Sequence, residues 1–436
     1  MAVQVRCAPL DNRFRPGRGV ITLPGVGRNV TVVLIDPAGD PIGVLPPFHV
    51  EVPWWPGATE IVDAVRERHG AEITVLRLIR TEPGPSHGGR VTYLASTDKP
   101  VDDAAPLTAD DVPELADHPL RAPWARPGGP EEILAWARER MAAAGRPVLG
   151  VVQERTWNLS AIWRLETAAG PTWLKVVPPF FAHEPAVLTW LHRAVPGRAP
   201  VPLVAEPGRV IMDRVSGDDR HDAPADERLP MVRSLVRIQA AALGALDELR
   251  AHAVPSLDLA DLKLAAIDVI DRRGGEASRR AVGEPPADAL AALDRLIDGL
   301  DDRVAAIAAC GVPTTLTHGD FHAGNVRVAA GAAPVILDWG DSVLTHPGFD
   351  LLRIREGLPG DGADAATSAW SAEWRAAVPG CDPERAVDLL GPLAELRNAV
   401  MYAGFLDGIE PSEWPYHARD VLPPLLAAAN LAGVPG

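Results

Sequence analysis

The sequence predicts an α+β protein with two lobes, a small antiparallel sheet followed by a helical lobe, and a small α/β domain before them. Three observations support this fold class. Short β-branched runs and turn clusters alternate over residues 1–98 and again after residue 147. A stretch rich in Asp and Pro, with little periodicity, separates the two regions at residues 99–129. Long segments with apolar residues at helical spacing fill most of the chain after residue 224.

The composition limits the classes of protein and of partner. The chain has 436 residues, 47% of them apolar, so two or three folded domains are expected. Its net charge of −16 argues against nucleic acid or an anionic membrane as a partner. Cys7, Cys310 and Cys381 have no metal-ligand spacing, so reduced thiols are expected. Since neither a signal peptide nor a membrane span is evident, a cytoplasmic protein is predicted. The sequence does not indicate an oligomeric state.

The first 98 residues are expected to form the small α/β domain. "NVTVVLID" and "EITVLRLIRT" have the composition of strands, and "TEIVDAVRERHG" has helical spacing and a closing glycine. The stretch around this helix faintly resembles a Nudix box. Aligned on Gly70, one expected glutamate falls on Glu67, but the other charged positions fall on Asp63, Ala64 and Arg68. Pyrophosphate hydrolysis is therefore not expected, and a plain strand–helix–strand unit is the preferred interpretation.

The two lobes are expected at residues 130–214 and 215–436. "PEEILAWARERMAAAG" predicts a helix, and "PVLGVVQE", "SAIWRLET" and "PTWLKVV" predict three strands of an antiparallel meander. A helix from about residue 182 to 193 and two further strands, "VPLVAE" and "RVIMDRV", complete the small lobe. The pattern after "SGDD" is helical, so a cleft between a small sheet and a helical lobe is predicted.

The segment "LTHGDFHAGNVRVAAGAAPVILDWGDSVLTHPGFDL" places acids and histidines beside apolar runs. Asp320 and Asn325 have the D-x-x-x-x-N spacing of a phosphotransferase catalytic loop, in which the Asp receives a hydroxyl proton and the Asn binds metal. Asp338 ends the apolar strand "PVIL" and is expected to bind Mg²⁺ between nucleotide phosphates. Burial of these carboxylates would be costly without such a partner.

Two further residues complete the expected nucleotide site. A cation must hold the phosphates from the small lobe, and Lys175 in the strand "TWLKVV" fits this role. A carboxylate on the neighbouring helix must hold that cation, and Glu184 stands near the start of the next helix. We therefore predict an ion pair between Lys175 and Glu184.

With these residues in place, the sequence resembles the aminoglycoside phosphotransferase family, relatives of choline kinases within the protein-kinase-like fold. "HGDFHAGN" matches the pattern His-Gly-Asp-x-His-x-x-Asn, and "HPGFDL" matches Asp-Pro-x-x-Asp-Leu with His346 in place of the usual Asp. The resemblance covers roughly residues 130–436. It implies that His318 and His322 shape the loop by hydrogen bonds, and that Asp350 accepts backbone N–H groups of the loop.

The resemblance also implies where the nucleotide binds. "VIMDRVSG" resembles the family's hinge, so the backbone groups of Asp213 and Val215 are candidates for contacts with the purine, with ATP and GTP both open. The loop "RTWNLSAIW" contains no glycine for close approach to phosphates, so Asn158 or Ser160 is expected to supply donors. Two interpretations of Asp341 are left open: a solvated turn residue, or a group that supports the ligands of the metal.

We therefore expect a phosphotransferase that moves the γ-phosphoryl group of ATP or GTP, with Mg²⁺, to a hydroxyl of a small molecule such as an aminoglycoside-like antibiotic. The alternatives are a housekeeping kinase for an amino alcohol or a sugar, and a nucleotide-binding regulator without transfer activity. The stretches "SGDDRHDAPADE" and "GFLDGIEPSEWPYHARD" combine acids and aromatics and suit a cationic acceptor, although a solvated loop and core residues explain them equally well. The second stretch contributes Glu410, Glu413, Trp414, Tyr416 and His417.

Overall fold

The computed structural model describes residues 27–108 and 115–432, and its first unit is a four-stranded sheet with strand order β2-β1-β4-β3. The central strands β1 and β4 are parallel, and the outer strands pair antiparallel with them. The helix predicted here is confirmed, since α1 ends at Gly70, which has the left-handed φ of 62° that favours glycine. The elements of this unit are β1 (Arg28–Ile35), β2 (Pro41–Val50), α1 (Thr59–His69), β3 (Thr74–Thr81) and β4 (Gly89–Ser96).

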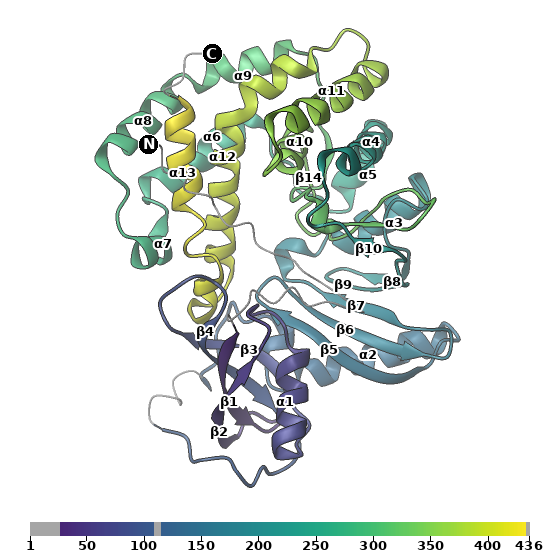
Figure 1. The fold of residues 1–436 in the computed structure, drawn as a ribbon, viewed down its shortest axis with the longest axis vertical. Coiled ribbons are helices and arrows are strands. Elements are labelled where there is room, and N and C mark those ends of the chain that lie inside the picture. Colours follow the sequence, from purple (N-terminus) through teal and green to yellow (C-terminus); the bar gives the residue numbers. More distant parts are fainter. Residues whose placement is uncertain (1–26, 109–114, 433–436) are drawn as a thin grey trace.

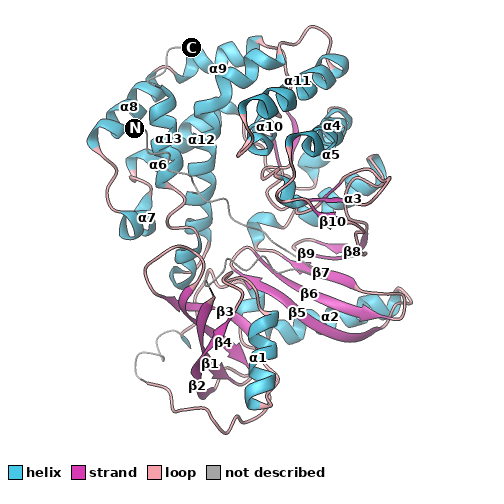
Figure 2. Ribbon diagram, in the orientation of Figure 1, coloured by secondary structure: helices cyan, strands magenta, loops and turns pink. Residues whose placement is uncertain are grey.

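The second sheet is antiparallel and has the order β5-β6-β7-β9-β8, with α2 on one face (Figure 2). Side chains alternate along β6, where Trp163 and Leu165 are buried against α2 and Ile162 and Arg164 are half-buried on the opposite face. The elements of this lobe are α2 (Gly129–Ala143), β5 (Val148–Trp157), β6 (Ser160–Thr167), β7 (Thr172–Val176), α3 (Glu184–Ala194), β8 (Pro202–Glu206) and β9 (Arg209–Met212).

The helical lobe follows, and the long helix α12 runs through it (Figure 1). Its helices are α4 (Ala225–Ala242), α5 (Leu246–Ala251), α6 (Leu259–Asp271), α7 (Gly275–Val282), α8 (Ala287–Asp298), α9 (Leu300–Ala309), α10 (Gly348–Arg355), α11 (Gly360–Ala377), α12 (Pro383–Gly408) and α13 (Leu422–Ala432). Two small sheets hold the segment between α9 and α10. One has three strands, β10 (Asp218–Asp219), which precedes α4, β12 (Val326–Val328) and β13 (Val335–Ile336), and the other has two, β11 (Thr315–Thr317) and β14 (Val343–Thr345). The α+β fold with a small sheet and a helical lobe is thus confirmed.

One apolar cluster joins the N-terminal sheet to both lobes. It contains Trp55 before α1, Trp157 at the end of β5, and Phe405 and Tyr416 from the helical lobe. The ring of Tyr416 lies 5.8 Å from the rings of both Trp55 and Trp157, in edge-on geometry. The N-terminal unit therefore packs on the small lobe and on the lower end of α12 (Figure 1).

Four buried ionisable side chains lie at the same interface. Glu410, just after α12, lies 2.9 Å from Nη2 of Arg121 and 3.5 Å from Nε of Arg77 in β3. Glu413 is 3% exposed and belongs to the same group. We call these four residues the interface quartet. Two guanidinium groups and two carboxyl groups at one buried site are costly to separate.

Glu410→Ala is expected to lower the free energy of unfolding by about 3 kcal/mol, because it removes the carboxylate beside two buried guanidinium groups. Urea denaturation of the full chain measures this difference. Glu82→Ala is the matched control, since Glu82 pairs with Arg90 at the surface and exposed pairs contribute little. A loss below about 1 kcal/mol in Glu410→Ala would contradict the account of the quartet.

Three further predictions concern membrane spans, cysteines and domain boundaries. Among residues 27–108 and 115–432, no helix has both the length and the apolar character that crossing a bilayer requires. Cys310 and Cys381 are free and buried, and Cys7 lies outside the described residues. The domain boundaries at residues 98 and 130 stay predictions.

Candidate active site

The loop after β11 is fixed by a buried carboxylate. Asp350, in the first turn of α10, accepts the backbone N–H groups of His318 at 2.8 Å and of Gly319 at 3.0 Å. Gln239 of α4 donates to the same carboxylate at 2.9 Å. Three donors on one buried carboxylate hold the chain immediately before Asp320 in a single position.

His318 is neutral and holds the loop by hydrogen bonds. His318 lies 2.7 Å through Nε2 from the carbonyl of Leu337, and its Nδ1 accepts the backbone N–H of Asp320 at 3.3 Å. One ring nitrogen therefore donates and the other accepts, and burial lowers the pKa of His318. The next residue, Gly319, has φ of 89°, and a Cβ there would collide with the carbonyl oxygen of Asp341.

Asp320 is engaged on both carboxylate oxygens. Oδ1 accepts from Nε of Arg353 at 2.7 Å, and Oδ2 lies 3.4 Å from Nε2 of His322. Burial alone would raise the pKa of Asp320, but Arg353 and then His322 outweigh it and hold the pKa well below its usual range. Asn325 donates from Nδ2 to the carbonyl of Asp320 at 3.0 Å, which joins the two ends of the D-x-x-x-x-N segment.

Lys175, Glu184 and Asp338 meet at one point between the lobes. Nζ of Lys175 lies 2.7 Å from Oε1 of Glu184 and 2.5 Å from Oδ1 of Asp338. Burial would lower the pKa of Lys175, but Asp338 and Glu184 outweigh it and raise the pKa above its ordinary value. The backbone N–H of Trp339 donates to the same oxygen of Glu184 at 3.1 Å. The ion pair predicted between Lys175 and Glu184 is present, and Asp338 of the helical lobe also pairs with Lys175.

Asp338 and Asn325 offer the donor atoms that suit Mg²⁺. Asp338 stands at φ of 61°, a strained position for a residue other than glycine, and its side chain is 34% exposed. Burial would raise its pKa, but Lys175 and then Arg155 outweigh it and keep the pKa of Asp338 below the usual value. Because Nδ2 of Asn325 is turned to Asp320, its amide oxygen lies at the opposite end. A charged carboxylate and an amide oxygen are ligands that Mg²⁺ prefers.

Two groups around the loop also have a defined place. Asp341 is half-buried, and partial burial, with the carboxylates of Asp320 and Asp338 nearby, raises its pKa well above the ordinary value. It is therefore not a fully solvated turn residue. His346, where the family usually has Asp, accepts the backbone N–H of Gly348 through Nδ1 at 3.1 Å. This is the bond that an Asp at a helix start would make.

The predicted hinge follows β9 directly. The backbone N–H of Asp213 donates to the carbonyl of Val201 at 2.9 Å, and its side chain pairs with Arg146 at 3.3 Å. Since its N–H is engaged, the carbonyl of Asp213 and the backbone of Val215 are the groups that could meet a purine. Their role stays a prediction.

The expectation for the side chains of Asn158 and Ser160 is wrong. Both residues are buried, at 2% and 3% exposure. Oδ1 of Asn158 lies 3.3 Å from Nε2 of His417, and Oγ of Ser160 accepts from the indole of Trp157 at 3.0 Å. The turn between β5 and β6 is held against the apolar cluster, so these side chains do not face a phosphate.

The expectation that the segment after α12 surrounds a cationic acceptor is also wrong. Glu410 and Glu413 belong to the interface quartet, and Tyr416 and His417 are buried at 2% and 0% exposure. Trp414 donates its indole N–H to the carbonyl of Leu406. The alternative interpretation, that these are core residues, is correct for Tyr416, which packs against the N-terminal unit. Trp414 is half-buried and lines a pocket.

Glu413 should make stability depend on pH. Burial, and then the carboxylate of Glu410, raises the pKa of Glu413 to about 8. Between about pH 5 and pH 8 the folded protein therefore holds a proton that the unfolded chain releases, and stability falls as pH rises. Glu413→Gln is expected to reduce this slope and to be the more stable protein near pH 8, as measured by urea denaturation across the range. Equal slopes in both proteins would contradict the expectation.

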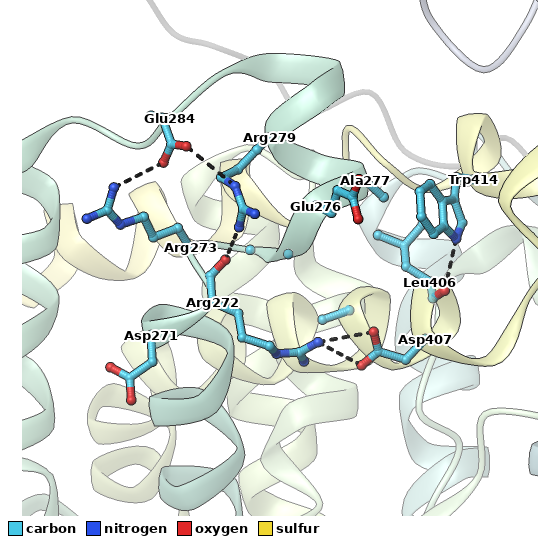
Figure 3. A pocket seen from close by; sticks show the side chains of 13 residues that line it. Asp271, Arg272, Arg273, Glu276, Ala277, Arg279, Glu284, Leu406, Asp407 and Trp414 are labelled. Carbon is cyan, nitrogen blue, oxygen red and sulfur yellow. Dashed lines mark hydrogen bonds and ion pairs between the residues drawn. The ribbon is translucent and has the colours of Figure 1, made fainter.

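A pocket of about 640 Å³ lies away from this chemistry, between the α6–α7 connection and α12 (Figure 3). Its cations are matched within the pocket, since Arg272 pairs with Asp407 at 3.0 Å and both Arg273 and Arg279 lie 3.4 Å from Glu284. Trp414 of the predicted acceptor stretch lines it, but none of the predicted catalytic, metal-binding or nucleotide-binding residues does. Among the described residues, no three His, Cys, Asp or Glu side chains form a metal-binding group.

Sequence reasoning missed the residues that hold Asp320 in place. Arg353 lies one helical turn after Asp350 in α10, so its spacing from a matched motif residue was a usable signal. Gln239 and Arg397, which donate to Asp350 and to the carbonyl of Gly319, come from α4 and α12. No local pattern marks them, because they reach the loop only through tertiary packing.

This chain is similar to a known family and to several solved structures. Residues 152–380, more than half of the chain, match the model of the phosphotransferase enzyme family. A search of curated proteins gave no match. Solved structures include a macrolide 2'-phosphotransferase from Brachybacterium faecium (16% identity, 66% of this chain and 97% of that one, TM-score 0.47). A choline kinase from Cryptosporidium parvum Iowa II has 9% identity over 69% of this chain and 95% of that one, with TM-score 0.48.

Proposed function

The chain belongs to the phosphotransferase enzyme family, and from this premise we propose that it moves the γ-phosphoryl group of a nucleoside triphosphate to a hydroxyl group of a small molecule. The observation that carries the proposal is the meeting of Lys175, Glu184 and Asp338 beside the loop of Asp320 and Asn325. These five side chains offer a cation for the phosphates and its partner, two oxygen ligands for Mg²⁺, and a carboxylate for the acceptor hydroxyl, which are roles that phosphoryl transfer uses.

Each of these residues has a separate role in the proposed transfer. Asp320 accepts the hydrogen bond of the acceptor hydroxyl and orients it toward the phosphorus. Lys175, braced by Glu184, holds the phosphates from the small lobe. Mg²⁺, when bound at Asp338 and Asn325, neutralises charge on the phosphate oxygens. Catalysis then rests on positioning and on electrostatic stabilisation.

The acceptor is open between an aminoglycoside-like antibiotic and a housekeeping amino alcohol or sugar. The test is release of labelled γ-phosphate from ATP or GTP by the full chain, with a panel of aminoglycosides, macrolides, choline, ethanolamine and sugars. Asp320→Asn is the control for contaminating kinases. Acceptor-dependent transfer above this control is expected. Tight nucleotide binding with no transfer to any acceptor would favour the regulator instead.

A further inference from the structure

A β-bulge lies in β5 at the edge of the small-lobe sheet. Gln153 pairs with Trp163 across β6, but Arg155 pairs with Ile162, so Glu154 is an extra residue in β5. In a regular strand Arg155 would pair with Ala161, whose side chain is fully buried beneath α2. The bulge therefore moves Arg155 from the core face of the sheet to the opposite face.

That opposite face carries Lys175. Ile162, the partner of Arg155, is itself paired with Lys175 in β7. Directly paired residues in an antiparallel sheet point to the same face, so Arg155, Ile162 and Lys175 form one row across three strands. Two strand spacings separate the cations by about 10 Å at their backbones. The row faces the point where Lys175 meets Asp338.

The N-terminal unit holds the bulge in place. β5 is an edge strand, and its outer side is covered by residues 56–59. Ala58 donates from its backbone N–H to the carbonyl of Glu154 at 3.1 Å, and Thr156 donates to the carbonyl of Pro56 at 3.0 Å. Oγ1 of Thr59 donates to the carbonyl of Gln153 at 2.8 Å. The backbone groups on both sides of Arg155 are thus engaged by a segment outside the matched family region.

The electrostatics agree with this direction. The charges of Arg155 and Asp338 are close enough to interact. Arg155 is half-buried as a whole residue, and its guanidinium lies 5.8 Å from the ring centroid of Trp157. Since the side chains of Asn158 and Ser160 are buried, the turn itself offers no side-chain donor among those predicted.

We propose that Arg155 binds the phosphates of the nucleotide from the strand that leads to the glycine-free turn, and that the N-terminal unit positions it by holding the bulge. This inference rests on the proposed function. A guanidinium presents several N–H donors in a planar fork that suits phosphate oxygens. It replaces close backbone approach with a charged side chain.

The test is isothermal calorimetry of the full chain with Mg²⁺ and ADP or GDP, whichever the unaltered protein binds, and with the matching nucleoside. Arg155→Gln is expected to raise the Kd for the diphosphate ~10- to 100-fold, as for loss of a hydrogen bond to a charged group, and to leave nucleoside binding unchanged. Arg155→Lys should restore part of the affinity. Arg164→Gln is the matched control, because it removes an arginine from the same face of the neighbouring strand β6, where Arg164 pairs with Glu154 and Glu166.

Each outcome decides between explanations. An equal loss in Arg164→Gln, an equal loss of nucleoside affinity, or an unchanged Kd in Arg155→Gln would overturn the role of Arg155 while the proposed function stands. An unaltered protein that binds no nucleotide would overturn the proposed function itself. Thermal unfolding of each variant separates lost binding from lost folding.

Discussion

Asp320→Ala is expected to lower kcat by ~10²–10⁴-fold with any accepted acceptor, while the Kd for nucleotide stays close to that of the unaltered protein. The carboxylate lies on the catalytic loop and contacts Arg353 and His322, whereas Lys175 and Asp338 form a separate ion pair. Steady-state kinetics together with calorimetry of nucleotide binding measures both quantities. A fall of less than tenfold in kcat would remove Asp320 from this role.

The environment of Asp320 also limits what it does. Arg353 helps to hold its pKa well below the usual range, so the carboxylate is a weak base at neutral pH. Efficient general bases have pKa values near the working pH. We therefore expect Asp320 to act mainly by orienting the hydroxyl. Arg353→Gln, which raises the pKa of Asp320, should shift the acid limb of the pH–rate profile upward, and an unmoved limb would argue against this coupling.

Asp338→Asn is expected to abolish the dependence of nucleotide binding on Mg²⁺, because it removes the one charged oxygen ligand of the expected pair. Asparagine is the suitable replacement, since it tolerates the φ of 61° found at this position better than other residues. Calorimetry with ATP or GTP, with Mg²⁺ and with EDTA, measures the effect. Affinities that still differ between Mg²⁺ and EDTA would place the metal elsewhere.

Asp341→Asn is the matched control for this change. Burial and its acidic neighbours raise the pKa of Asp341 well above the ordinary value, which makes this carboxyl a poorer ligand for Mg²⁺ than Asp338. Its Mg²⁺-dependent binding should be that of the unaltered protein. If Asp341→Asn alone abolished the dependence, Asp341 would be the metal ligand in place of Asp338.

The local motifs made much of the site predictable. Asp320, Asn325 and Asp338 come from a single segment in which spacing and strand ends limit the geometry, and Lys175 and Glu184 are joined by one short connection. The strands and α1 of the N-terminal unit were also evident, because their apolar spacing is strong. The same holds for the helical character of the second lobe, although the pattern did not show that Gly299 separates α8 from α9.

The errors came from contacts between distant parts of the chain. Acids and aromatics after α12 were interpreted as an acceptor site because their partners Arg77 and Arg121 lie some 300 residues earlier and have no local signature. Asn158 was assigned to phosphate for the same reason, since its neighbour His417 is equally remote. The bulge at Arg155 depends on residues 56–59. Burial by another unit cannot be recognised from spacing alone.

The apolar cluster shared by the N-terminal unit and both lobes has a consequence for the order of folding. It combines Val30, near the start of the described chain, with Trp157 and with Tyr416, close to its end. During synthesis, this apolar surface of the N-terminal sheet stays uncovered until Phe405 and Tyr416 have been made. Contacts of such long sequence separation form slowly, and the outer edge of β5 stays open to other chains in the meantime if the sheet is late to dock. The yield of folded protein should therefore fall at higher expression temperature and rise with added chaperones, even where the folded protein itself is stable.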